Sequence, residues 1–152
     1  MQLSDLADYQ ALQSVAGEEW PRLRPEILER LRAPGLAARD AAVDIFLHER
    51  LVDDAIAALE SDHLGHALVG RVVDAVMRER PEWAMQACFH QADRIIEPGS
   101  AQYYQAAAEW LAKAREAAVA GGLVGEWEKR MDEIMARHQR KYKLMPLLKA
   151  LR

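Results

Sequence analysis

Apolar residues recur along this chain with the period of an α-helix. Leu64, Leu68, Val72 and Val76 return at every fourth position, and later stretches repeat the i, i+3, i+4, i+7 spacing. Each such stripe gives one helix an apolar face that has to be buried against a neighbour. No stretch alternates apolar and polar residues as a half-buried strand would. The pattern predicts an all-α fold.

Residues that start or stop helices lie between these stripes. Ser61 can cap a helix start, Pro81 suits a first helical turn, and Gly121-Gly122 suits a helix end. Short connections between long helices favour antiparallel neighbours. The predicted helices cover residues 3–15, 18–32, 36–48, 50–60, 63–79, 82–96, 101–120 and 123–143, with a short segment at 146–151.

Consecutive helices form pairs of similar kind, and two second helices open alike, with Glu82-Trp83 and Glu126-Trp127. This predicts one domain over residues 1–152, built of stacked antiparallel helical hairpins. The stack resembles a degenerate tetratricopeptide-like repeat, and an irregular helical bundle is the open alternative. In the 63–96 hairpin we expect six apolar side chains in the interface: Leu68, Val72, Val76, Met85, Phe89 and Ala92.

Composition is that of a folded protein, with 51% hydrophobic and 29% charged residues. The net charge of −4 is unevenly divided. Residues 1–128 carry 12 Lys and Arg against 22 Asp and Glu, whereas residues 129–152 carry 8 against 2. The chain therefore combines an acidic body with a basic C-terminal segment.

Two classes of protein are disfavoured by what the sequence lacks. Residues 1–12 show no basic segment followed by an apolar run, and no apolar run approaches the ~20 residues that cross a membrane. The single cysteine, Cys88, allows no internal disulfide. We expect a cytoplasmic protein without a membrane partner.

Metal-ligating residue types occur at one suggestive spacing. His63-x-x-His66 can place two imidazoles on one helix face, but a zinc site needs further ligands. Cys88 and His90, two positions apart on a helix, point in nearly opposite directions. We expect no metal and no other cofactor at these four residues.

Catalytic motifs are not distinctive. Glu18-Glu19 and Asp53-Asp54 suit solvated helix starts, where negative charge meets the positive end of the helix dipole. Gly121-Gly122 follows a helix rather than a strand, so it lacks the context of a phosphate-binding loop. We expect no catalytic residues and no enzyme.

The tryptophans give a further, ambiguous signal. Buried packing is the favoured role for most of them, and an exposed one could be a partner hot spot. The four are Trp20, Trp83, Trp110 and Trp127.

The C-terminal run 137–152 carries the most information. Its bases suit contact with an anionic partner, whereas its leucines suit a cap that closes the helical stack. We favour the cap, with Arg137, Arg140 and Lys141 as a possible partner contact. The leucines expected to be buried are Leu144, Leu147, Leu148 and Leu151.

Several short motifs together resemble a known family. They are residues 17–21 (GEEWP), 79–84 (ERPEWA), 125–127 (GEW) and the ending through 141–148 (KYKLMPLL). They resemble the helical region that follows the zinc-finger module of bacterial SWIM zinc-finger proteins, over most of the chain. The resemblance implies a neighbouring zinc module that contacts DNA or protein. The zinc motif itself, Cys-x-Cys followed by Cys-x-His, is absent, so zinc binding carries over to no residue here.

These observations predict a non-catalytic protein–protein interaction or scaffold domain associated with a SWIM zinc-finger module. The alternative is a nucleic-acid-associated accessory domain that uses the basic C-terminal segment. The expected partner is a protein in the first case and a nucleic acid in the second.

Overall fold

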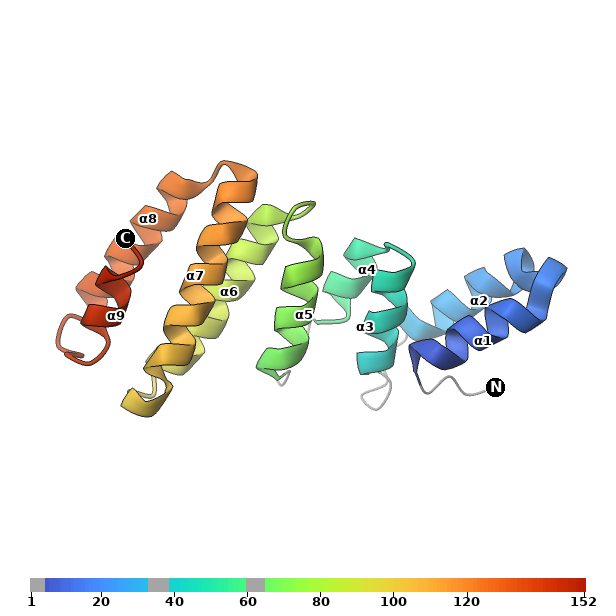
Figure 1. Cartoon of the computed structure of the whole chain (residues 1–152), viewed down its shortest axis with the longest axis horizontal. Helices are drawn as coiled ribbons and strands as arrows, with labels where there is room; N and C mark the ends of the chain where they lie inside the picture. Colours follow the sequence, from blue (N-terminus) through green and yellow to red (C-terminus); the bar gives the residue numbers. More distant parts are fainter. Residues whose placement is uncertain (1–4, 33–38, 60–64) are drawn as a thin grey trace. The chain divides into compact units, whose positions relative to one another are not determined.

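The computed structural model describes residues 5–32, 39–59 and 65–152, which fold into helices without any strand (Figure 1). The predicted all-α fold is confirmed. The chain divides into two compact units, residues 1–72 (unit 1) and residues 73–152 (unit 2). The division falls inside helix α5 (His66–Val76). The single domain over residues 1–152 stays a prediction.

Unit 1 contains α1 (Leu6–Ala16), the 3₁₀ turn η1 (Gly17–Glu19), α2 (Trp20–Arg32), α3 (Arg39–His48), α4 (Val52–Ala57) and the start of α5. Asp5 begins α1, because its side chain accepts a hydrogen bond from the Asp8 N–H at 2.9 Å. The core of unit 1 includes Tyr9, Leu28, Val43, Ile45, Phe46 and Ala55.

A polar network joins α1, α2 and the end of α3. The buried Tyr9 hydroxyl donates to Glu49 Oε1, and Arg24 Nη2 donates to Glu49 Oε2 at 3.1 Å. Burial raises the pKa of Tyr9, so it stays a neutral donor. Burial also acts to raise the pKa of Glu49, but the hydrogen bonds from Tyr9 and Arg24 outweigh it and lower that pKa. Glu49 is therefore a charged acceptor between two helices.

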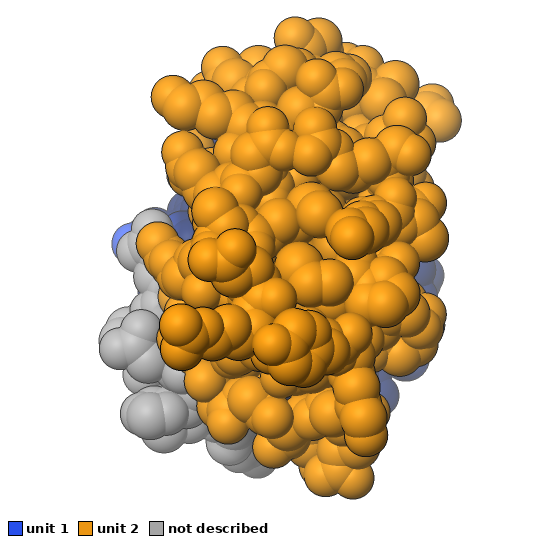
Figure 2. Space-filling view, turned by 90° about the vertical axis from the view of Figure 1, so that its left-hand side faces the viewer, with its two compact units in different colours: residues 1–72 blue, residues 73–152 orange. Residues whose placement is uncertain are grey.

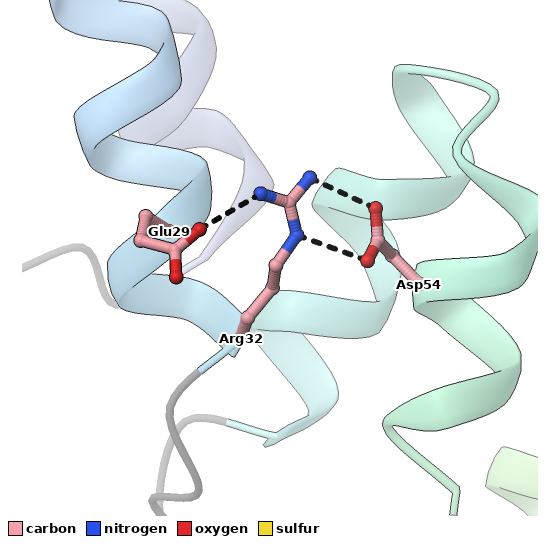
Figure 3. Close-up of polar contacts among 3 residues, drawn as sticks. All are labelled: Glu29, Arg32 and Asp54. Carbon is pink, nitrogen blue, oxygen red and sulfur yellow. Dashed lines mark hydrogen bonds and ion pairs between the residues drawn. The ribbon is translucent and has the colours of Figure 1, made fainter.

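A second ion pair joins α2 to α4 (Figure 3). Arg32 donates to both carboxylate oxygens of Asp54, from Nε at 2.9 Å and from Nη2 at 3.0 Å. Its remaining nitrogen, Nη1, lies 3.2 Å from Glu29 Oε2. This forked geometry gives the contact between the two helices a defined direction.

Unit 2 contains the end of α5, then α6 (Pro81–Ile96), the 3₁₀ turn η3 (Ala101–Tyr103), α7 (Tyr104–Gly121), α8 (Val124–Arg137) and α9 (Met145–Lys149). Helices α6 and α7 run antiparallel and share the most extensive interface (Figure 1). The buried face of α7 is mostly alanine, so the two backbones approach closely. Those alanines are Ala107, Ala108, Ala114, Ala117 and Ala118.

Larger side chains complete the core of unit 2. Trp127 of α8 is buried and donates from Nε1 to the Leu111 carbonyl at 3.0 Å, which ties α8 to α7. The guanidinium of Arg130 lies 4.4 Å from the centre of the Phe89 ring. All six side chains predicted for the 63–96 interface are buried, Leu68 and Val72 in unit 1 and the other four in unit 2.

The C-terminal segment folds back onto unit 2. Helix α9 lies against α7 and α8, Leu144 and Leu148 are fully buried, and Leu147 and Leu151 are half-buried. Figure 2 looks onto the side of unit 2 formed by α8 and α9 and shows a continuous surface there. Two of the four leucines predicted for the cap are thus fully buried, and the cap itself stays a prediction.

Several predicted helix ends are wrong. Helix α8 ends at Arg137, not at residue 143, because the chain turns there: the Lys141 N–H donates to the His138 carbonyl at 2.8 Å. Helix α5 ends at Val76 and not at 79, where a tight turn returns the Arg80 N–H to the Val76 carbonyl at 2.8 Å. The predicted cap Ser61 lies outside the described residues, as does the start of the 36–48 helix. In the described ranges, no helix is both long and apolar enough to cross a membrane.

Candidate functional site

The surface of unit 2 carries an open hollow where the α5–α6 turn meets the end of α7. Its volume is about 550 Å³. The lining combines the turn, the first residues of α6 and the residues that link α7 to α8. We call it the turn hollow, and its residues are Glu79, Arg80, Pro81, Glu82, Trp83, Gln86, Gly121 and Leu123.

Local sequence explains why the hollow forms here. Pro81 is the first residue of α6, a position that needs no N–H donor. Gly121 lets α7 approach that ring, because a Cβ at Gly121 would lie only 2.7 Å from Pro81 Cβ and Cγ. Gly122 then adopts φ +68°, and the Leu123 N–H donates to the Ala118 carbonyl at 2.7 Å. The helix ending therefore places Leu123 beside Pro81.

The turn hollow pairs apolar walls with acidic edges. Pro81, Trp83 and Leu123 are half-buried, so each still offers apolar surface to solvent. Glu79, Arg80 and Glu82 are exposed beside them, so the edges carry two negative charges and one positive charge. Its lining includes no cysteine, serine or histidine that could act as a nucleophile or proton carrier near neutral pH. The lining instead combines apolar surface with charged side chains of both signs.

The basic C-terminal residues predicted as a partner contact are largely used inside unit 2. Lys141 donates from Nζ to the Ile96 carbonyl at 2.8 Å and so caps the end of α6. Arg137 Nη1 lies 3.9 Å from Glu97 Oε1. Arg140 is exposed. Of the three predicted residues, Lys141 is held by a backbone carbonyl, Arg137 forms a pair that stays exposed, and Arg140 is exposed.

His138, the first residue after α8, is buried. Its Nε2 is 3.7 Å from Glu97 Oε1. Burial lowers the pKa of His138, and the neighbouring Lys141 and Arg137 act in the same direction, against Glu97 and Asp93. His138 is therefore neutral at pH 7. Burial raises the pKa of the nearby Asp93 carboxyl.

The structure separates the residues considered as metal ligands. Cys88 is fully buried, and burial raises the pKa of its thiol to about 12. His90 is exposed, so the two diverge as their spacing predicts. His66 is exposed on α5, and His63 lies outside the described residues. In residues 5–32, 39–59 and 65–152, no three His, Cys, Asp or Glu side chains gather as metal ligands would.

The tryptophans differ in role. Trp127 is buried, whereas Trp20, Trp83 and Trp110 are half-buried. Trp20 packs edge-on against Tyr9 with ring centres 5.1 Å apart, and Lys113 Nζ lies 5.4 Å from the Trp110 ring centre. Trp83 lines the turn hollow. The 79–84 motif and Gly121-Gly122 were both recognised in the sequence, but they were not predicted to form one site.

Comparison with known proteins adds no relative. No family model matches the chain, and neither the curated proteins nor the solved structures give a match. Nothing in these comparisons links the chain to SWIM zinc-finger proteins, so that resemblance stays a prediction.

Proposed function

We propose that this chain is a non-catalytic protein-interaction module that binds a short segment of a partner protein in the turn hollow. The observation that carries the proposal is the hollow itself, with apolar Pro81, Trp83 and Leu123 beside acidic Glu79 and Glu82. Tryptophan is a frequent hot spot of protein interfaces, and Trp83 still offers part of its surface to solvent. A tetratricopeptide-like stack is part of the proposal, since such repeats present surfaces of this kind.

The hollow is suited to binding because its walls are fixed before a partner arrives. Pro81 and Gly121 are in close contact, and the Leu123 backbone is held by the end of α7. A preformed wall loses little conformational entropy on binding, which leaves more of the contact energy as affinity. The acidic edges favour a segment that carries lysine or arginine.

The alternative, a nucleic-acid contact through the basic segment, has less support. Four of the eight bases in residues 129–152 already interact inside unit 2: Arg130 with Phe89, Arg137 with Glu97, Lys141 with the Ile96 carbonyl, and Arg152 with Asp132. Nucleic-acid affinity depends on how many cations reach phosphates. The ion pairs of Arg137 and Arg152 are exposed and weak, so it is mainly the contacts of Arg130 and Lys141 that reduce that number.

Selection from a displayed random-peptide library tests the proposal. We expect the full chain to enrich peptides that carry a base beside an apolar residue. Binding should be lost with Glu82→Lys, which reverses one edge, and with Trp83→Ala, which removes one wall. Tyr103→Ala, an exposed aromatic outside the hollow, is the matched control and should bind normally. Enriched peptides that bind equally to both hollow variants would refute the proposal.

A further inference from the structure

The two ends of unit 2 differ in shape and chemistry. One end holds the turn hollow, where the start of α6 meets the end of α7. At the other end, the end of α6 meets the turn between α8 and α9, as the bond from Lys141 to the Ile96 carbonyl shows. Both ends belong to unit 2, so their composition can be compared directly.

The second end carries an exposed projection. Tyr142 is 79% exposed, although tyrosine usually buries much of its ring. Arg140 and Lys143, also exposed, stand on either side of it in the chain. We call Arg140, Tyr142 and Lys143 the basic knob.

The basic knob sits on a fixed turn rather than on a loose tail. The Lys141 N–H donates to the His138 carbonyl at 2.8 Å, and the Leu144 N–H donates to the Lys141 carbonyl at 2.9 Å. The buried Leu144 and the Lys141 side chain anchor the turn from both sides. An exposed aromatic on such a turn can enter a partner at low entropic cost.

The turn hollow and the basic knob are complementary. The hollow offers apolar walls, two carboxylates and the guanidinium of Arg80, which leaves it a net charge of −1, whereas the knob offers an aromatic ring and two cations. We propose that the occupant of the turn hollow is the basic knob of a second copy of this chain, so that copies associate head to tail. This inference rests on the proposed function, because it names the partner of the same site.

The geometry favours a copy of the chain over a nucleic acid as the ligand of the knob. Two cations would give double-stranded DNA a salt slope of only about −1.8, which is characteristic of weak binding. The ring of Tyr142 matches the apolar walls of the hollow, and the two flanking bases match its carboxylates. Hollow and knob are different surfaces, so the contact is heterologous and can propagate beyond a dimer. A contact this small belongs to the weak, transient class.

Sedimentation velocity of the full chain at concentrations up to about 1 mM, the scale of weak contacts, tests the inference. We expect a mean mass that rises with concentration past that of a dimer. Association should fall steeply in about 1 M salt, where the Debye length is about 3 Å. Tyr142→Ala and Trp83→Ala should each stay monomeric, whereas Tyr103→Ala should associate as the unaltered chain does.

Mixing the variants makes the test specific. Tyr142→Ala keeps its hollow and Trp83→Ala keeps its knob, so an equimolar mixture should form a dimer that cannot grow. Because Trp83→Ala could weaken the fold, a charge exchange serves as a second measurement. Lys143→Glu and Glu82→Lys should each abolish association, and the double variant should regain it.

The outcomes separate this inference from the proposed function. A chain that stays monomeric at about 1 mM, a mixture without dimer, or a double variant without recovery would each overturn the head-to-tail contact. If selected peptides still bind the hollow in that case, the protein-interaction function stands with another partner. If peptides fail as well, both fall.

Discussion

The contacts inside unit 1 differ in kind from the contacts inside unit 2. In unit 1, charged side chains join helices in addition to the apolar core, by the Tyr9–Glu49–Arg24 network and the Arg32–Asp54 pair. In unit 2, α6 and α7 meet through alanines, and Trp127 and the cap leucines close the core. Polar networks depend on protonation and geometry, whereas apolar packing depends on volume. The two units should therefore respond to different perturbations.

Removing the cap should have the largest effect. Deletion of residues 144–152 removes Leu144 and Leu148, whose burial contributes about 1.5–3 kcal/mol each, so the free energy of unfolding should fall by about 3–6 kcal/mol. Urea denaturation followed by tryptophan fluorescence measures it. Deletion of Arg152 alone is the control. A truncated chain that unfolds at the same urea concentration as the full chain would refute the cap. Salt-sensitive nucleic-acid binding that is lost on the same truncation would support the alternative function.

A cavity in the core of unit 2 should come next. Phe89 is fully buried, so Phe89→Ala should lower the free energy of unfolding by about 3–5 kcal/mol. Tyr103, 56% exposed, provides the matched aromatic control, and Tyr103→Ala should change it by no more than about 0.5 kcal/mol. Equal effects of the two substitutions would mean that Phe89 is not a core residue.

Breaking the polar network of unit 1 should cost less. Glu49→Gln removes the charge that accepts from Tyr9 and Arg24 and should lower the free energy of unfolding by about 1–3 kcal/mol. The exposed Glu26 supplies the control Glu26→Gln. A double-mutant cycle with Arg24→Ala should show coupling between the two residues. Simple additivity would count against the network.

Acid should distinguish the units further. Because the pKa of His138 is lowered in the folded state, the unfolded chain binds more protons, and stability should fall as pH drops below about 6.5. The pKa of Glu49 is lowered too, but its contribution is lost only below about pH 4.3. Asp93, with a raised pKa, acts in the opposite sense at acidic pH. The free energy of unfolding, measured by denaturation at pH 7 and at about pH 5.5, should therefore be lower at the lower pH because of His138 in unit 2. His138→Gln should make this pH dependence smaller.

The ion pair of Arg32 should give the smallest effect. Both partners are partly exposed, so Arg32→Ala should lower the free energy of unfolding by no more than about 1 kcal/mol, and less at high salt. Thermal denaturation at low and high salt measures the change. A loss as large as that of Phe89→Ala would show that charged contacts dominate unit 1 more than their exposure implies.

Helical stripes were predictable because the helical period is a local property of the sequence. The burial of Met85, Phe89 and Leu148 follows from that period and from the need to cover leucines. The early end of α8 was not predictable from the apolar pattern, and the turn that follows it is accompanied by a contact of Lys141 with the Ile96 carbonyl, 45 residues away in sequence. The turn hollow likewise depends on the contact between Pro81 and Gly121.

The polar contacts of unit 1 show the same limit. Tyr9 and Glu49 are 40 residues apart, and no local pattern couples a tyrosine in one helix to a carboxylate at the end of another. The burial of Leu144 and Leu148 in the basic segment was predictable from its apolar pattern. Which of its bases would turn inward was not, since Lys141 and Arg140 are adjacent and only their tertiary surroundings differ.

Mapping of a bound peptide by the ¹H–¹⁵N spectrum of the full chain tests the central claim most directly. The probe is the peptide most enriched by library selection. Binding in the turn hollow should shift the Trp83 indole and the amides of Gln86, Gly121 and Leu123. Shifts centred on Arg140 and Lys143 instead would contradict the account and assign binding to the basic end of unit 2.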